Sequence, residues 1–292
     1  MSPEVVGGLR CRLGEGALWD PGLGRLLWVD IVGHRVHSLD PSTGARDEHE
    51  VSDDVGTVVV ARNGRLLVAL RDRLAALDPA TGTLATVVPI EPDRPDTRCN
   101  DGKCDPAGRF WVGTLVEGAA RGTAALYCLD AELELSVRLK GVTISNGLCW
   151  SGDGRRLYYI DTPEQRVDEI AFDAATGRLG ARRVALEIPP ALGAPDGMTI
   201  DVEDQLWIAL WGGGAVIRVD PIAGRITERI AIPTTNVTSC AFGGASLDQL
   251  FVTTARVGRS DAELAREPLA GALFRVEVGA RGVAAARFAR DL

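Results

Sequence analysis

The segment RLLWVDIVGHRVHSLDPSTG (residues 25–44) contains a pattern of β-rich runs and turns that recurs along the chain. An apolar run is followed by a second β-rich run and an Asp-Pro-x-x-Gly turn, in which proline presets φ and glycine takes the positive-φ position. Runs that match RLLWVDI (25–31) recur as RLLVAL (65–70), RFWVGT (109–114), RLYYID (156–161), QLWIAL (205–210) and QLFVTT (249–254). The runs that follow them end in Asp40, Asp78, Asp130, Asp173, Asp220 and Glu277. The chain therefore repeats one β-rich unit six times.

The spacing of these units predicts how they pack. Their closing acidic residues lie 38 to 57 residues apart, which suits three or four short strands per unit. Six such units leave exposed sheet edges unless they close radially. The sequence thus predicts an all-β fold, a six-bladed β-propeller that forms a single domain over residues 1–292. We expect VVGGLR (5–10) to complete the last blade beside VAAARFAR (283–290), and one helical turn within 260–269.

Composition excludes several classes of function. The 292 residues are 46% hydrophobic and 25% charged, as in globular proteins, and the net charge of −8 argues against nucleic acid as a partner. No stretch approaches the ~20 apolar residues of a membrane span, and no signal peptide is evident, so we expect a cytoplasmic protein without a membrane partner. The six cysteines form no CxxC pair and are expected to be reduced. The three histidines lie together within 34–49, which argues against a histidine-rich zinc site.

The first strand of each unit suggests where a functional site lies. Aligned on the turns that follow them, these strands begin at Glu15, Gly56, Asn100, Asn146, Asp196 and Thr238. The first strand of a propeller blade lines the central channel, so equivalent positions form a ring around the axis. Four of the six residues are Glu, Asn, Asn and Asp, which strands do not favour.

A cation would explain this ring of polar residues. Clustered carboxylates repel one another and lose solvation, and a bound cation relieves both costs. Carboxylate and amide oxygens suit Ca²⁺, Mg²⁺ or Mn²⁺, and they are also compatible with Zn²⁺ or Fe²⁺. The sequence therefore predicts one divalent metal ion in the central channel. Arg98 stands two residues before Asn100, at the expected entrance of the channel.

Long motifs in the same order resemble the regucalcin, gluconolactonase and luciferin-regenerating enzyme family. They include LGEGALWDPGLGRLLWVDI (13–31), RCNDGKCDPAGRFWVGT (98–114), ISNGLCWSGDGRRLYYIDT (144–162), APDGMTIDVEDQLWIALWGGG (194–214) and VTSCAFGGASLDQLFVTTA (237–255). The resemblance covers nearly the whole chain. It implies a six-bladed propeller that hydrolyses sugar lactones to aldonic acids with one divalent metal.

The resemblance also implies roles for particular residues. Glu15, Asn146 and Asp196 fall on the family's metal-ligand positions, and Asp196 matches the residue proposed as the general base. Arg98 and Asn100 fall on positions that contact the substrate. Glu117 lies where many members have acidic residues that bind substrate hydroxyls, although Gly118 follows where some members have a second acid.

Three other interpretations stay open at this point. The same scaffold and metal would serve an organophosphate hydrolase, because a polarised P=O replaces C=O. A calcium-binding or regulatory propeller would bind the metal without turnover. A scaffold that binds protein partners would instead carry an apolar patch at the mouth of the channel. The sequence specifies neither the lactone, nor the native metal, nor the oligomeric state.

Overall fold

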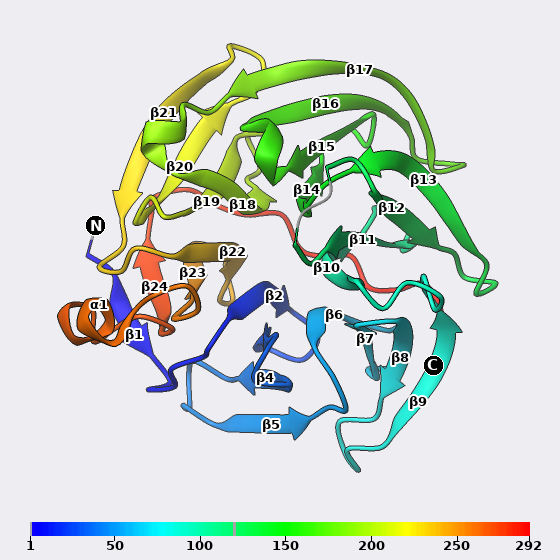
Figure 1. The fold of residues 1–292 in the computed structure, drawn as a ribbon, viewed down its shortest axis with the longest axis horizontal. Helices are drawn as coiled ribbons and strands as arrows, with labels where there is room; N and C mark the ends of the chain where they lie inside the picture. The colour runs from blue at the N-terminus through cyan, green and yellow to red at the C-terminus, as the bar shows by residue number, and fades with distance from the viewer. Residues whose placement is uncertain (1, 119–120) are drawn as a thin grey trace.

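Six four-stranded sheets are arranged radially around a central axis (Figure 1) in the computed structural model, which describes residues 2–118 and 121–292. Within a sheet each strand pairs antiparallel with the next, and the first strand lies nearest the axis. The first strands of neighbouring sheets contact one another all the way round the ring. The six-bladed propeller predicted from the repeats is confirmed.

Each blade contains four strands, named in order from the axis outward. Blades 1 to 3 contain β2 (Gly14–Asp20), β3 (Arg25–Asp30), β4 (Arg35–Leu39) and β5 (Arg46–Glu50); β6 (Val55–Val60), β7 (Leu66–Leu70), β8 (Arg73–Leu77) and β9 (Leu84–Pro89); β10 (Thr97–Cys104), β11 (Phe110–Val116), β12 (Ala124–Leu129) and β13 (Leu135–Val142). Blades 4 to 6 contain β14 (Ser145–Trp150), β15 (Arg156–Asp161), β16 (Arg166–Asp173) and β17 (Arg178–Glu187); β18 (Ala194–Ile200), β19 (Leu206–Trp211), β20 (Ala215–Asp220) and β21 (Arg225–Ala231); β22 (Val237–Gly243), β23 (Gln249–Thr254), β24 (Leu273–Glu277) and β1 (Glu4–Val6).

The N-terminal strand closes the ring, but not with the partner that the sequence suggested. β1 pairs with β24, so that Val5 lies opposite Phe274 and the first residues of the chain form the outer edge of blade 6 (Figure 1). The predicted partner, segment 283–290, was wrong. The sixth repeat already ends at Glu277, and its third strand, β24, offers the free sheet edge to which β1 binds.

The last residues, 280–292, form a strap that crosses the propeller at the end of the channel where the first strands end (Figure 1). The Val283 amide donates to the Ile200 carbonyl in blade 5 at 3.4 Å. Further along, the Phe288 amide donates to the Val60 carbonyl in blade 2 at 2.9 Å. The Phe288 side chain is fully buried, so the strap is anchored by packing as well as by backbone hydrogen bonds.

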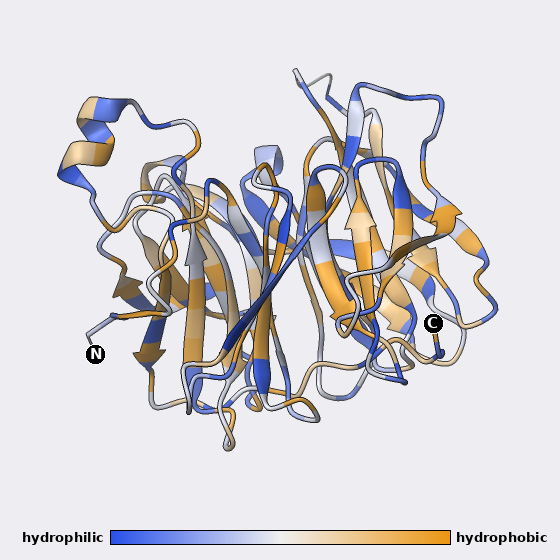
Figure 2. Cartoon of the chain, turned by 90° about the horizontal axis from the view of Figure 1, so that it is seen from below, coloured by the Kyte–Doolittle hydropathy of each residue, from blue (hydrophilic) through white to orange (hydrophobic). Residues whose placement is uncertain are grey.

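The hydrophobic core lies between neighbouring blades rather than in one central body. Trp207 of blade 5 meets Phe242 of blade 6 edge to face, with 5.4 Å between ring centroids, and Trp111 of blade 3 meets Trp150 of blade 4 in the same way. The side view in Figure 2 shows most apolar residues on the strands and the short helix α1 (Asp261–Arg266) apart from them at one rim.

Helical structure is limited to three short segments of the part that the structure describes. These are α1 and the 3-10 turns η1 (Thr162–Glu164) and η2 (Pro190–Leu192). The α1 helix lies within the predicted segment 260–269, and a capping box between Ser260 and Glu263 fixes its start. No helix within 2–118 or 121–292 is long and apolar enough to cross a membrane.

Candidate active site

A β-bulge interrupts the pairing of the first strand in every blade, at the ring position identified from the repeats. In β14 the register shifts between Ser145 and Leu148, which brackets Asn146, and in β18 it shifts between Pro195 and Met198, which brackets Asp196. The shifts in β6, β10 and β22 likewise bracket the ring residues Gly56, Asn100 and Thr238. In β2 the shift begins directly after Glu15, which itself pairs with Val29. A bulge bends the strand and redirects a side chain out of the regular alternation. Asn100, Asn146 and Asp196 therefore occupy irregular positions at one mouth of the channel, and Glu15 lies directly beside one.

Glycines beside these residues let neighbouring strands approach closely. A Cβ atom on Gly147 would stand 2.6 Å from the carbonyl oxygen of Asp196 in the next blade. A Cβ atom on Gly197 would likewise stand 2.6 Å from the Ser239 hydroxyl. Such contacts are too short for any side chain larger than hydrogen. The glycine after each polar residue thus permits Asn146 and Asp196 to lie on adjacent strands at the narrow end of the blades.

Three carboxyl groups gather in this mouth and are almost inaccessible to water. Glu15, Asp101 and Asp196 are 7%, 7% and 5% exposed. Burial, followed by the charges of Asp196 and Asp101, raises the pKa of Glu15 well above its usual range. Burial and the charge of Asp101 raise the pKa of Asp196 in the same way. Glu15 and Asp196 are thus disfavoured as anions by burial and by neighbouring carboxyl charges, which a bound cation would offset. Burial also raises the pKa of Asp101, while the Lys103 charge acts in the opposite direction.

Asn146 presents an unpaired oxygen in the same place. Its side chain is 5% exposed, and its Nδ2 donates to the Thr162 hydroxyl at 3.0 Å. The hydroxyl in turn donates to the Pro195 carbonyl at 2.8 Å, which fixes the orientation of the amide. Asn146 Oδ1 is buried and has no hydrogen-bond partner. A buried acceptor without a partner is costly, and together with the carboxylates it forms a donor set that fits a hard divalent cation.

Arg98 and Asn100 stand beside the carboxyl cluster on β10. Arg98 Nη1 donates to Asn100 Oδ1 at 2.8 Å and to the Cys99 carbonyl at 3.0 Å. Asn100 Nδ2 donates to the Ser145 carbonyl in the next blade at 2.8 Å. Burial lowers the pKa of the Arg98 guanidinium, while nearby acids, Glu15 among them, act in the opposite direction. The pair thus supplies fixed donors next to the cluster.

Glu117 lies apart from this cluster, in the loop that follows β11. Its side chain is half exposed, and Arg71 from blade 2 holds it through Nη2 to Oε1 at 2.8 Å and Nη1 to Oε2 at 3.3 Å. The same guanidinium bonds to Asp54 at 2.9 Å and faces Asp53 at 3.6 Å. Glu117 is therefore a rim residue that Arg71 holds in place, and among the described residues no hydrogen bond links it to the ring residues.

The rim also contains a compact group of possible metal ligands, His34, Asp53 and Asp54. His34 Nε2 lies 3.0 Å from Asp54 Oδ1. Arg71 already pairs with both acids, at 2.9 Å from Asp54 and 3.6 Å from Asp53, so a metal ion there would compete with a bound guanidinium. The channel cluster lacks such an arginine contact at ion-pair distance within 2–118 and 121–292, and for this reason it is the better cation site.

Sequence reasoning placed Glu15, Asn100, Asn146 and Asp196 at one mouth, and the structure brings them there. It missed Asp101, which follows Asn100 within the same bulge, and Thr162, which orients Asn146. An acidic or amide residue before glycine, as in EG, NDG, NG and DG, was the available signal for the bulge. No sequence pattern indicated that Arg71 would contact Glu117, because only folding brings blade 2 against the loop of blade 3.

Fold and site together define a six-bladed β-propeller with an oxygen-rich polar cluster in the mouth of its channel. Residues 13–256 match the family described as SMP-30/Gluconolactonase/LRE-like region, and the chain belongs to that family. Regucalcin of Gallus gallus is 36% identical over 96% of both chains. YvrE of Bacillus subtilis, named as a putative sugar lactone lactonase, is 34% identical over 97% of both. The solved structure of a calcium-binding protein, regucalcin of Agrobacterium tumefaciens, has a TM-score of 0.94 and 30% identity, covering 98% of this chain and 97% of that one.

Proposed function

We propose that this protein is a metal-dependent lactonase that opens sugar lactones, of the aldonolactone type, to aldonic acids. The observation that carries the proposal is the unpaired, buried Asn146 oxygen beside the carboxyl groups of Glu15 and Asp196. Membership of a family that contains proteins named as lactonases supports the same chemistry. In this proposal Glu15, Asn146 and Asp196 hold one divalent ion, with Ca²⁺, Zn²⁺, Mn²⁺, Mg²⁺ and Fe²⁺ as candidates.

A lactone is a cyclic ester, and its hydrolysis adds water across one C–O bond. When bound, the cation would supply Lewis-acid stabilisation for the charge that develops on the carbonyl oxygen. Asp196 takes a proton as the water oxygen joins the carbonyl carbon, and it passes that proton to the ring oxygen as the ring C–O bond breaks. The products are a hydroxyl group and a carboxylic acid, which releases its proton to solvent at neutral pH.

The neighbouring side chains position the substrate. Arg98 and Asn100 are already locked to each other and to the next blade, so they offer donors in a fixed geometry. Arg98 would orient the lactone oxygens, and Asn100 would orient a sugar hydroxyl. Glu117 would accept a hydroxyl hydrogen bond at the rim, with Arg71 fixing its direction. Glu15 acts only as a source of negative charge that keeps the cation in place.

A pH-stat assay over a panel of sugar lactones tests the proposal, after spontaneous ring opening is subtracted. Chelation should abolish turnover and add-back of one of the five cations should restore it. Asp196→Asn should retain the fold and lose turnover, whereas Asp220→Asn, in an exposed turn of the same blade, should retain kcat. Wild-type turnover in the Asp196 variant would remove the base from the mechanism.

A calcium-binding role without turnover is the second candidate, since relatives include proteins described as calcium-binding. Saturable Ca²⁺ binding that depends on Glu15, with no lactone hydrolysed by any cation-loaded form, would favour it. Faster turnover of organophosphates than of lactones would instead favour the related hydrolase reaction on the same scaffold.

A further inference from the structure

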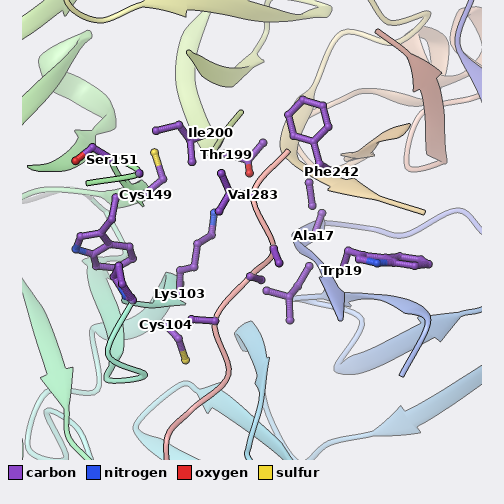
Figure 3. Close-up of a pocket in the computed structure, with 18 residues that line it drawn as sticks. Ala17, Trp19, Lys103, Cys104, Cys149, Ser151, Thr199, Ile200, Phe242 and Val283 are labelled. Carbon is purple, nitrogen blue, oxygen red and sulfur yellow. The ribbon is translucent and has the colours of Figure 1, made fainter. Parts of the chain in front are cut away.

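A second cavity lies at the opposite end of the channel from the carboxyl cluster. Its volume is about 210 Å³, and its lining comes from the later residues of the first strands, such as Trp19 and Ile200, together with residues of the strap (Figure 3). Trp19 stands four residues after Glu15, and Ile200 four residues after Asp196. At about 3.3 Å per strand residue the two ends are separated by about 13 Å. The cavity is therefore distinct from the candidate active site.

The walls of this cavity are mostly apolar. Ala17 and Ile200 line the space from blades 1 and 5, and Val283 lines it from the strap (Figure 3). Trp19 and Phe242 border the same space, but their rings extend away from it toward the core partners Phe251 and Trp207. An apolar cavity of about 150 Å³ is enough to hold benzene in an engineered case. The present cavity has room for a ring of that size and a small substituent. Polyhydroxylated sugar acids would leave their hydroxyl groups unpaired against such walls.

One charged group enters the cavity, and it is largely unused. Lys103 extends from β10 across the space, and its Nζ donates to the Met198 carbonyl at 2.7 Å (Figure 3). An ammonium group has three donors, and this is the one hydrogen bond of Lys103 Nζ among the described residues. No carboxylate within 2–118 or 121–292 forms an ion pair with it. The Asp101 carboxyl is near enough for the Lys103 charge to lower its pKa, but the two make no direct contact.

The choice of lysine is itself informative. The chain has 32 basic residues, of which only Lys103 and Lys140 are lysines. Lysine presents a compact ammonium head on a flexible apolar stem, whereas arginine requires partners for a planar fork of five donors. The Lys103 ammonium group offers free donors at the edge of an apolar space. It is therefore suited to bind a small anion whose remaining surface is apolar.

We propose that this cavity binds a small organic monocarboxylate with a ring-sized apolar body. The carboxylate accepts hydrogen bonds from the two free donors of Lys103, and the apolar body packs against Ala17 and Ile200. Val283 and its neighbours in the strap form the outer wall. This site differs from the proposed lactonase site in position, ligand class and metal requirement, so it stands or falls independently of that function.

The two lysines allow a direct test with sodium benzoate as the probe. Protein labelled with ¹³C at the lysine ε position gives two methylene signals, assigned with Lys103→Met and Lys140→Met. Chelator is present throughout, so that a carboxylate on a channel cation does not contribute. Benzoate should shift the Lys103 signal saturably and leave the Lys140 signal in place. Benzyl alcohol, which has the ring without the charge, and acetate, which has the charge without the ring, should each bind at least about tenfold more weakly.

Variants complete the test. Lys103→Met should raise the Kd for benzoate about tenfold or more, as expected for loss of a charge-assisted hydrogen bond of at least about 1.4 kcal/mol. Lys140→Met, at an exposed site, should leave the Kd unchanged. Val283→Trp fills the cavity from the strap and should abolish binding while Lys103 is intact, which keeps the test valid if Lys103→Met does not fold. A Lys103 signal that does not respond to benzoate, or responds equally to all three probes, would show a cavity that holds only water.

Discussion

Replacing Asn146 by alanine isolates the atom on which the cation proposal rests. In the cation-free protein the change removes the Nδ2 bond to Thr162, worth about 1 kcal/mol, and also removes the unpaired buried Oδ1, whose penalty is about 1–3 kcal/mol. These two effects oppose each other. The cation-free variant should therefore unfold within about 2 kcal/mol of the cation-free wild type.

The cation-loaded proteins should differ much more. A cation at 100 times its Kd stabilises the folded wild type by about 2.7 kcal/mol, which raises Tm by about 4 °C at this chain length. Loss of a supporting partner of a metal ligand weakens binding up to about 100-fold, and loss of a ligand oxygen should cost at least as much. At the same cation concentration the variant would retain about 0.4 kcal/mol, or about 1 °C.

Differential scanning calorimetry with chelator and then with each candidate cation measures both quantities. Asn63→Ala is the control, since Asn63 lies in the turn that follows β6, where its Nδ2 donates to the Leu292 carbonyl at 2.8 Å, away from the ring positions. The control should lose stability equally with and without the cation. If Asn146→Ala kept the full cation-induced rise in Tm, the unpaired oxygen would not be a ligand, and the reasoning would be wrong.

Two further predictions concern the rim and the frame of the blades. Arg71→Met frees Glu117 from its two hydrogen bonds, so KM for a sugar lactone should rise several-fold while kcat stays within about twofold. Arg73→Met, at the start of β8, should change neither constant. An unaltered KM in the Arg71 variant would remove Glu117 from substrate binding. Asp105 is fully buried, and its carboxylate accepts hydrogen bonds from the Trp111 indole at 2.9 Å and the Arg109 guanidinium at 2.6 Å. Asp105→Ala leaves both donors unpaired and should lower the free energy of unfolding, measured by urea titration, by about 3 kcal/mol. A loss under about 1 kcal/mol would show that water replaces the carboxylate.

Most of the fold could be predicted from the repeats, because each blade is formed by residues that are close in sequence. A strand, a turn and the next strand are close in sequence, so the Asp-Pro-x-x-Gly turns and apolar runs report on neighbours that also pair in space. Closure of the ring joins the two ends of the chain, and no local pattern distinguishes β24 from the strap as the partner of β1. That is why the predicted pairing of 5–10 with 283–290 was wrong.

For the ring of polar residues, the sequence predicted the positions but not their surroundings. Repeat alignment put Glu15, Asn100, Asn146 and Asp196 in equivalent places, because register within a strand is set by the turn that follows it. It did not reveal that a bulge occurs there in every blade, or that Asp101 adds a third buried carboxyl group. It also left Lys103 as an ordinary strand residue.

Periodicity along the amino-acid sequence was enough to predict the number of blades and the four polar residues that recur at one position. Only the tertiary structure decided the burial and mutual repulsion of the carboxyl groups, the unpaired oxygen of Asn146, the hold of Arg71 on Glu117 and the cavity around Lys103. Desolvation and pairing depend on what lies opposite a side chain, and in a propeller that neighbour comes from another blade or from the far end of the chain.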